Sequence, residues 1–188
     1  SKFWGSELAA DFSTYEGKAL AAARIQDRAY AKESLILCDF AWPILHSFSN
    51  DHVGDPSVEA RILSAVTGMD IDEPGLNRIG ERIFNLQRAI LVREGHRGRQ
   101  DDRIPDSFYT MPLKGDAVNP NCTVPGRNGE IISRKGAVAD KNDFEKMRDE
   151  YYELRGWDID TGLQKVAKLK ELGLYEVARD LAQAGLAV

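Results

Sequence analysis

The clearest constraint on the fold is the hydrophobic pattern that follows Asp72. Aliphatic residues recur there in steps of three and four, which is the spacing of one face of an α-helix. These residues are Leu76, Ile79, Ile83, Leu86 and Ile90. We predict a helix that begins after Asp72-Glu73-Pro74, runs to about Arg93 and ends at Gly95. Its apolar stripe is expected to pack in a core rather than against a cofactor.

Four polar residues share this helix with the stripe, namely Glu81, Arg82, Asn85 and Arg88. A helix cannot keep all four away from its apolar face, so some of them must lie beside it. Because buried charges in proteins are usually paired, we expect internal ion pairs.

Further helices are predicted at about 14–34, 56–67, 142–155, 162–172 and 174–184. The first follows a capping box, Ser13-Thr14-Tyr15-Glu16, and the second has Asp55 as its cap. Ile62, Leu63 and Val66 are expected to face inward. The third helix takes its apolar side from Phe144, Met147, Tyr151 and Leu154.

The segment at about 95–140 is rich in Gly, Pro, Asp and Asn and is too long for a simple connector. Within it, Asn128-Gly129 lies between two β-prone runs, Cys122-Thr123-Val124 and Glu130-Ile131-Ile132. Asn-Gly in that position favours a hairpin turn. The chain is therefore predicted to be predominantly α-helical, with one small hairpin at most.

Composition limits the classes of function. A chain of 188 residues that is 43% hydrophobic can bury one core, in one domain or two small ones. Its net charge of -5 gives no reason to expect nucleic-acid binding. No apolar run reaches the roughly 18 residues of a membrane span, and no secretory leader opens the chain, so we expect no membrane association and a cytoplasmic location. Cys38 and Cys122 are expected to be reduced thiols or a metal ligand rather than a disulfide.

Cys38 lies in an unusual setting. It ends the run Glu33-Ser34-Leu35-Ile36-Leu37-Cys38, which directly follows the predicted helix 14–34. The run offers a hydrogen-bond acceptor and an apolar wall beside a thiol, and this combination suits the edge of a cofactor. The alternative is a buried structural thiol, which is the usual state of an unpaired cysteine.

Other candidate sites are weaker. Asp158-Ile159-Asp160-Thr161-Gly162 starts like a calcium loop, but Leu169 stands where the bidentate glutamate should be. A zinc site on Cys38, His46 and His52 lacks a fourth ligand. Basic residues at 93, 96, 97, 99 and 103 could bind an anion, but Glu94, Asp101 and Asp102 stand among them, so a self-paired loop is the preferred interpretation.

Several blocks of the sequence, in the same order, resemble the C-terminal helical part of the tungsten-containing aldehyde ferredoxin oxidoreductases. The blocks are Glu33-Ser-Leu-Ile-Leu-Cys38-Asp-Phe-Ala, Ile79-Gly-Glu-Arg-Ile-Phe-Asn-Leu-Gln-Arg-Ala, Val92-Arg-Glu-Gly, Asp101-Asp102-Arg-Ile-Pro105 and Met147-Arg-Asp-Glu-Tyr-Tyr-Glu-Leu-Arg-Gly-Trp157. The resemblance covers nearly the whole chain.

The resemblance implies roles for three residues. In this family an Asp-x-x-Gly-Leu-Cys element approaches a tungsten-bis(pterin) centre; its acid accepts hydrogen bonds from a pterin, and its cysteine completes the ligation of a [4Fe-4S] cluster. Glu33 and Cys38 match these two positions, and Leu37 presents backbone between them. The sequence departs from the pattern in two places, because Glu33 replaces the aspartate and Ile36 replaces the glycine. Both changes affect the pterin contact more than the cluster ligation.

The resemblance also implies a fold and a function. Residues 1–188 would form the all-α, multi-helical C-terminal region of a longer oxidoreductase, with the N-terminal pterin-binding sheet domain absent. The parent would oxidise aldehydes to carboxylic acids with ferredoxin as electron acceptor. This part alone would be inactive, hold neither cofactor and contribute no catalytic residue. Its partners would be the N-terminal domain, ferredoxin and, as an open choice, further copies in a homo-oligomer.

Two alternatives to this function remain open. One is a tungsten subunit that acts on an aromatic or acyl-coenzyme A substrate. The other is a helical scaffold or interaction domain that binds no cofactor.

Overall fold

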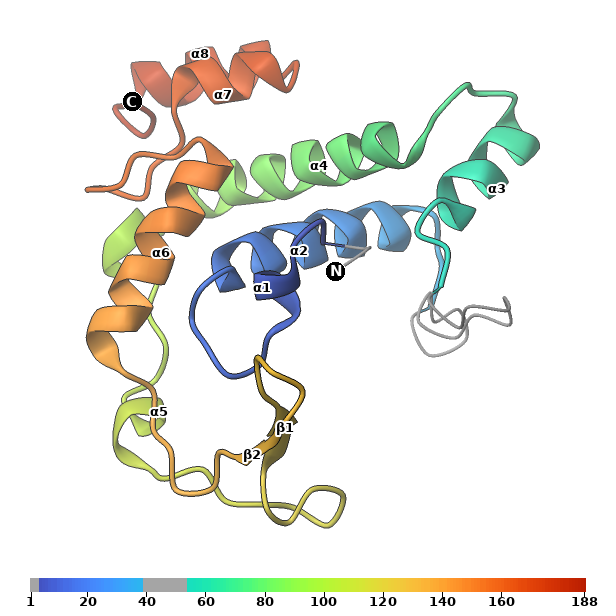
Figure 1. Cartoon of the computed structure of the whole chain (residues 1–188). Coiled ribbons are helices and arrows are strands. Elements are labelled where there is room, and N and C mark those ends of the chain that lie inside the picture. The colour runs from blue at the N-terminus through green and yellow to red at the C-terminus, as the bar shows by residue number, and fades with distance from the viewer. Residues whose placement is uncertain (1–3, 39–53) are drawn as a thin grey trace.

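The computed structural model describes residues 4–38 and 54–188, and in these residues the chain is mostly helical (Figure 1). The helices are α1 (Glu7–Ala10), α2 (Lys18–Ser34), α3 (Val58–Thr67), α4 (Glu73–Arg93), α5 (Ser107–Thr110), α6 (Lys141–Arg155), α7 (Val166–Glu171) and α8 (Tyr175–Gln183), with one 3₁₀ turn at Gly98–Gln100. The strands are β1 (Thr123–Pro125) and β2 (Ile131–Ser133). The predicted all-α class with a long irregular segment and one small hairpin is confirmed. None of the helices in the described part has the length and apolar character needed to cross a membrane.

Helices α2 and α4 lie side by side and run in opposite directions, with α3 at one end of the pair and α6 across the other (Figure 1). Their approach is close because Gly80 has no side chain. A β-carbon at this position would lie 1.9 Å from the carbonyl oxygen of Asp27. The buried side of α2 is built largely from alanine, including Ala19, Ala23 and Ala31, which also allows the two backbones to approach.

Helix α4 has the predicted length but not the predicted inner face. Asp72 caps it by accepting a hydrogen bond from the Gly75 N–H at 2.9 Å. Of the predicted stripe, only Leu76 is buried, whereas Leu86 and Ile90 are exposed by 38% and 43%. The positions that α4 does bury are Leu76, Gly80, Asn85, Arg88, Ala89 and Val92. The inner face is displaced because α2 packs on one side of α4 and α8 on another.

Two other details of the prediction are wrong. Helix α2 starts at Lys18 rather than near residue 14, because Gly17 adopts a left-handed conformation with φ 76° and the Thr14 side chain accepts a hydrogen bond from Glu16 N–H in a tight turn. In α3, Ile62 and Val66 are exposed, and the buried residues are instead Glu59 and Ala60.

Helix α6 and the hairpin follow the prediction. Asp140 caps α6, and Gly156 ends it with φ 65°. Leu154, however, is exposed rather than part of the apolar side. The hairpin is antiparallel with Val124 opposite Ile132. Arg127 in its turn forms ion pairs with Asp11 at 3.5 Å and Glu16 at 3.0 Å, so the hairpin is held beside the residues that precede α2.

The C-terminal helices form a small core of their own. Leu169, Leu172, Leu174, Ala178 and Leu181 pack together with Ala89 of α4. The chain end closes this unit, because the Val166 N–H donates to the Val188 carbonyl at 2.6 Å.

Candidate functional site

The three predicted site residues lie at the C-terminal end of α2. Leu37 N–H donates to the Lys32 carbonyl at 3.2 Å, and Ile36 N–H donates to the Glu33 carbonyl at 3.0 Å. This pair of hydrogen bonds is the Schellman arrangement, which satisfies carbonyls that a helix end leaves unpaired. Glu33 and Cys38 are exposed and Leu37 is half-buried. The helix end therefore presents a carboxylate and a thiol to the surroundings.

Ile36 occupies a strained position in this helix end. Its φ is 59°, in the left-handed region that glycine normally fills at this point of a Schellman ending. A β-branched residue there is an outlier. The Ile36 side chain is 92% exposed, so packing within the described residues does not compensate for the strain. The left-handed conformation thus falls at the position where the family's Asp-x-x-Gly-Leu-Cys pattern has glycine.

Positive charge lies close to this helix end. Lys32 is only 2% exposed, and Arg28 donates to Glu59 at 2.8 Å. Burial lowers the pKa of Lys32 and Arg28 lowers it further, while Glu59 and Cys38 act in the opposite direction. A neighbouring cation favours the thiolate form of a cysteine, which is the form that binds metals.

The two cysteines, Cys38 and Cys122, lie in different parts of the described structure. Cys122 is buried beside the hairpin, which is anchored to residues before α2. Cys38 follows the C-terminal end of α2, whereas Cys122 directly precedes β1. Residues 4–38 and 54–188 contain no group of three or more His, Cys, Asp or Glu side chains that could hold a metal ion. A [4Fe-4S] cluster needs four such ligands, so Cys38 fits one corner of it and no more.

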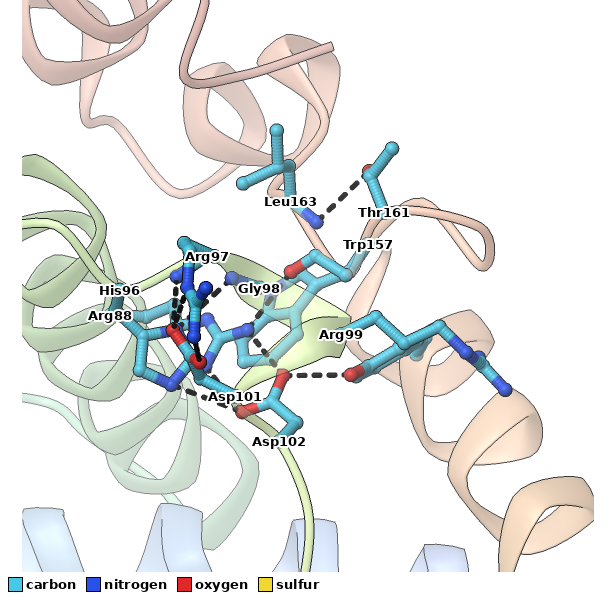
Figure 2. Close-up of polar contacts among 12 residues, drawn as sticks. Arg88, His96, Arg97, Gly98, Arg99, Asp101, Asp102, Trp157, Thr161 and Leu163 are labelled. Atoms are coloured by element: carbon cyan, nitrogen blue, oxygen red, sulfur yellow. Dashed lines mark hydrogen bonds and ion pairs between the residues drawn. The ribbon is translucent and has the colours of Figure 1, made fainter.

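A second polar centre surrounds Asp102, in the loop after α4 (Figure 2). Arg88 donates two hydrogen bonds to its carboxylate, at 2.8 and 2.5 Å, and the Tyr152 hydroxyl donates a third at 2.7 Å. His96 Nε2 lies 3.5 Å away. Burial raises the pKa of Tyr152, and the bond to Asp102 adds to this. Arg88 also lies 4.5 Å from the centre of the Trp157 ring, so Asp102 links α4 to α6 and the turn after it.

The predicted self-pairing of the basic residues in this loop is confirmed in part, because Arg97 and Arg99 form ion pairs whereas Arg93 and Arg103 form none with the described residues. Arg99 bonds Asp149 at 2.5 Å and Glu145 at 2.8 Å, and Arg97 bonds Asp101 at 2.5 Å. Gly98 allows the loop to lie against the turn that ends at Gly162, because a β-carbon there would be 2.1 Å from the carbonyl oxygen of Thr161. The charges of Arg97 and Arg99 are therefore neutralised within the chain.

Two buried networks hold the same region together. The Asn85 side-chain oxygen accepts hydrogen bonds from Trp157 Nε1 at 2.9 Å and from Gln164 Nε2 at 2.7 Å. Arg155 donates to Asp27 at 2.5 Å and to the Ala23 carbonyl at 3.0 Å, which ties α6 to α2. Burial raises the pKa of Asp27, and Arg155 opposes that shift.

These networks confirm the expectation of internal pairing on α4 and explain several sequence blocks. Arg88 pairs with Asp102, and Glu81 pairs with Lys168 of α7 at 2.7 Å. Sequence reasoning did not find the partners Tyr152 and Gln164, which come from distant parts of the chain. Asp158 begins a turn and accepts hydrogen bonds from Thr161, in keeping with the rejection of a calcium loop.

Some predicted features cannot be placed. The part of the first family block that begins at Asp39 lies outside the described residues. The same is true of His46 and His52, the two histidines of the rejected zinc site.

Comparison with known families identifies the class of protein. The family model described as aldehyde ferredoxin oxidoreductase, domains 2 and 3, matches residues 3–174. The match covers most of the chain and includes both the end of α2 and the Asp102 network. This chain belongs to the aldehyde ferredoxin oxidoreductase family.

Curated relatives agree with this assignment. The chain is 31% identical over 115 residues to the tungsten-containing aldehyde ferredoxin oxidoreductase of Pyrococcus horikoshii, a match that covers 61% of this chain and 16% of the relative. It is 33% identical over 119 residues to the aliphatic sulfonate oxidoreductase, WOR-like subunit, of Pyrococcus furiosus, covering 63% and 17% respectively. The matched part is thus about one sixth of each relative.

A solved structure has the same fold. The active site complex BamBC of benzoyl coenzyme A reductase, in complex with 1,5 dienoyl-CoA, matches with a TM-score of 0.61 at 20% identity. The match covers 93% of this chain and 22% of that chain. At this identity the likeness concerns the fold alone.

Proposed function

We propose that this chain is the C-terminal part of a tungsten-bis(pterin), [4Fe-4S] oxidoreductase that oxidises aldehydes to carboxylic acids and delivers the electrons to ferredoxin. In this proposal Cys38 supplies one thiolate to the cluster, and Glu33 accepts hydrogen bonds from a pterin. The N-terminal pterin-binding domain of the same enzyme is the partner that meets this surface.

The observation that carries the proposal is the form of the α2 end. Glu33 and Cys38 are both exposed there, and Ile36 keeps a left-handed backbone at the position of the family's glycine. A β-branched residue in that conformation costs on the order of 1 kcal/mol. Strain of this kind persists where the surroundings or a function maintain it, and no packing of the Ile36 side chain within the described residues maintains it.

The residues suit the two cofactors. Iron in a cluster is bound by cysteine thiolates, and Cys38 supplies an exposed cysteine at the end of α2. A carboxylate such as Glu33 accepts charge-assisted hydrogen bonds from the N–H groups of a pterin. The longer side chain of Glu33 gives that acceptor one methylene more reach than aspartate.

The bound cofactors would supply the redox chemistry. Conversion of an aldehyde and water to a carboxylic acid releases protons and an electron pair, and ferredoxin would take up the electrons one at a time. The chain's own contribution is to hold a cluster corner and to orient a pterin edge. No residue of this chain is assigned a catalytic role.

Metal analysis of the full-length enzyme tests the proposal. Tungsten or molybdenum together with iron is the expected result. A folded, metal-free enzyme would contradict it and would favour the cofactor-free scaffold. Glu33→Gln in the same enzyme should lower the pterin content while the iron content stays constant, and Glu153→Gln, an exposed change on α6, is the matched control.

A second candidate is a tungsten subunit that acts on an aromatic or acyl-coenzyme A substrate. The support is the likeness of fold to the benzoyl coenzyme A reductase complex over 93% of the chain. Turnover assays with an aliphatic aldehyde and with an aromatic acyl-coenzyme A ester separate the two candidates.

A further inference from the structure

A cavity of about 300 Å³ lies between α2, α4 and α6, away from the Cys38 end of α2. Its volume is at the lower end of the range for small-molecule sites. It exists because α2 contributes small side chains here, Ala19 and Ala22, one turn apart. The facing side of α6 contributes Phe144, Met147 and Tyr151, the predicted apolar side of that helix.

The walls of the cavity are aromatic. Its lining includes five rings, from Phe84, Phe144, Tyr151, Tyr152 and Trp157. The rings of Phe84 and Trp157 are stacked with an interplanar angle of 6°, and the Tyr151 ring meets Trp157 edge-on at 90°. Flat and edge-on rings together suit a planar apolar ligand, because aromatic groups prefer stacked and T-shaped contacts.

The charge at the cavity is positive. Of the charged residues in its lining, Lys18, Arg88, Arg103 and Arg148 are basic and Asp102 is acidic. Arg88 is neutralised by Asp102, and Arg148 by Glu145. Lys18 donates to the Leu8 and Glu16 carbonyls, at 2.7 and 3.1 Å, and the charges of Asp11 and Glu16 act on it from a longer range. Neither Lys18 nor Arg103 forms a direct ion pair with a carboxylate of residues 4–38 or 54–188.

Buried donors in the lining also lack partners. The Nε groups of Arg88 and Arg148 are buried and have no hydrogen-bond partner among the described residues. The Arg88 side chain is only 7% exposed. Such unsatisfied donors are costly and mark places where a ligand or water completes the structure.

We infer that the cavity between α2, α4 and α6 binds a planar aromatic carboxylate, with its ring between the aromatic walls and its carboxylate near Lys18 and Arg103. This site is independent of the Cys38 end of α2 and does not rest on the proposed redox function.

Titration with benzoate tests the inference on the chain itself. The readout is the chemical shift of the Trp157 indole N–H, assigned with Trp4→Phe and Trp42→Phe variants. We expect a saturable shift with a dissociation constant on the order of millimolar, the range of weak small-ligand binding. Benzyl alcohol, which lacks the charge, and cyclohexanecarboxylate, which lacks the planar ring, should each bind more weakly.

Two variants test the location. Ala22→Leu fills the cavity and should weaken benzoate binding by at least about tenfold, the effect of lost space in a packed site. Ala182→Leu, an exposed change on α8, is the matched control and should have no effect. Arg103→Gln, a change at an exposed position, should weaken binding by roughly threefold, as expected of an exposed charge contact.

Three results would overturn the inference. They are the absence of a saturable shift, unchanged affinity in both Ala22→Leu and Arg103→Gln, and equal affinity for benzoate and the two comparison compounds.

Discussion

The end of α2 and the Asp102 network are both built from the sequence blocks by which this chain resembles its family, but their side chains are directed differently. In the Asp102 network the polar groups meet partners inside the chain. Arg88 donates to Asp102 (Figure 2), and the Tyr152 hydroxyl donates to the same carboxylate. At the end of α2, Glu33 and Cys38 are exposed and Ile36 is strained.

This difference in exposure indicates two separate reasons why a sequence block is shared with the family. The network is explained by stability, because each member fills or satisfies a place in the fold. The helix end is not, because an exposed isoleucine in a left-handed conformation gains no packing within the described residues. The predictions that follow test this division, starting with the largest expected effect.

The largest loss of stability is expected from Arg155→Met. The Arg155 side chain is 2% exposed, and its removal leaves the buried Asp27 carboxylate without its cation. Breaking a buried ion pair in this way costs about 3–5 kcal/mol. Urea unfolding followed by circular dichroism measures the change. Arg179→Met, at a side chain that is 62% exposed, should change stability by less than about 0.5 kcal/mol. A loss for Arg155→Met as small as that of the control would show that the network does not stabilise the fold.

Asn85→Ala should have the next largest effect. The substitution removes the side-chain oxygen that accepts from both Trp157 and Gln164, so Trp157 Nε1 loses its partner and Gln164 Nε2 keeps only its bond to the Asn85 backbone carbonyl. A buried unsatisfied donor costs about 1–3 kcal/mol, and we expect a total loss of about 2–3 kcal/mol. Thermal unfolding measures it, with the exposed Gln87→Ala on the same helix as control. Equal melting temperatures for the two variants would remove Asn85 from the stabilising network.

Ile36→Gly should have the opposite sign and stabilise the chain. Glycine adopts φ near 59° without strain, and the exposed isoleucine gives up no packing within the described residues. We expect a gain of about 0.5–1 kcal/mol in the free energy of unfolding. Ile36→Val keeps the β-branch and should leave stability unchanged. If Ile36→Gly destabilises the chain, the isoleucine makes stabilising contacts, and stability then explains the end of α2 as well as the Asp102 network.

The smallest expected effect concerns pH. Arg97 holds the pKa of Asp101 at about 2, chiefly through hydrogen bonds from its side chain and backbone. Because this pKa is below the ordinary value of 3.8, the unfolded chain binds the proton more tightly. The stabilisation is therefore present above about pH 4 and is lost as the pH falls toward 2. Stability measured from pH 5 to pH 2 should decline less steeply in Asp101→Asn. Identical slopes would show that Asp101 does not contribute.

The sequence predicts helix α4, helix α6 and the hairpin well, because caps and turn residues act locally. It predicts the inner faces poorly. Leu86 and Ile90 continue a perfect helical stripe, yet they are exposed, since the packing of α2 and α8 rather than the stripe decides which side of α4 is covered. The start of α2 depends on the left-handed Gly17, which the capping pattern at 13–16 concealed.

For the candidate site, too, the sequence predicts local features well and long-range contacts poorly. Glu33 and Cys38 could be singled out because their motif is contiguous in the sequence. Asp102 could be recognised only as one acid among basic residues, since its partner Tyr152 is 50 positions away. The strain at Ile36 can be recognised only from its backbone φ angle, which the sequence pattern does not predict.

The most direct test of the account is the iron content of the full-length enzyme with Cys38→Ala, compared with Cys122→Ala. Cys38 is exposed and its removal should change the stability of the chain by less than about 0.5 kcal/mol, so a loss of iron cannot be attributed to unfolding. The account predicts that Cys38→Ala loses cluster iron and the electron paramagnetic resonance signal of the reduced cluster, while Cys122→Ala retains both. Unchanged iron and an unchanged signal in Cys38→Ala would contradict it.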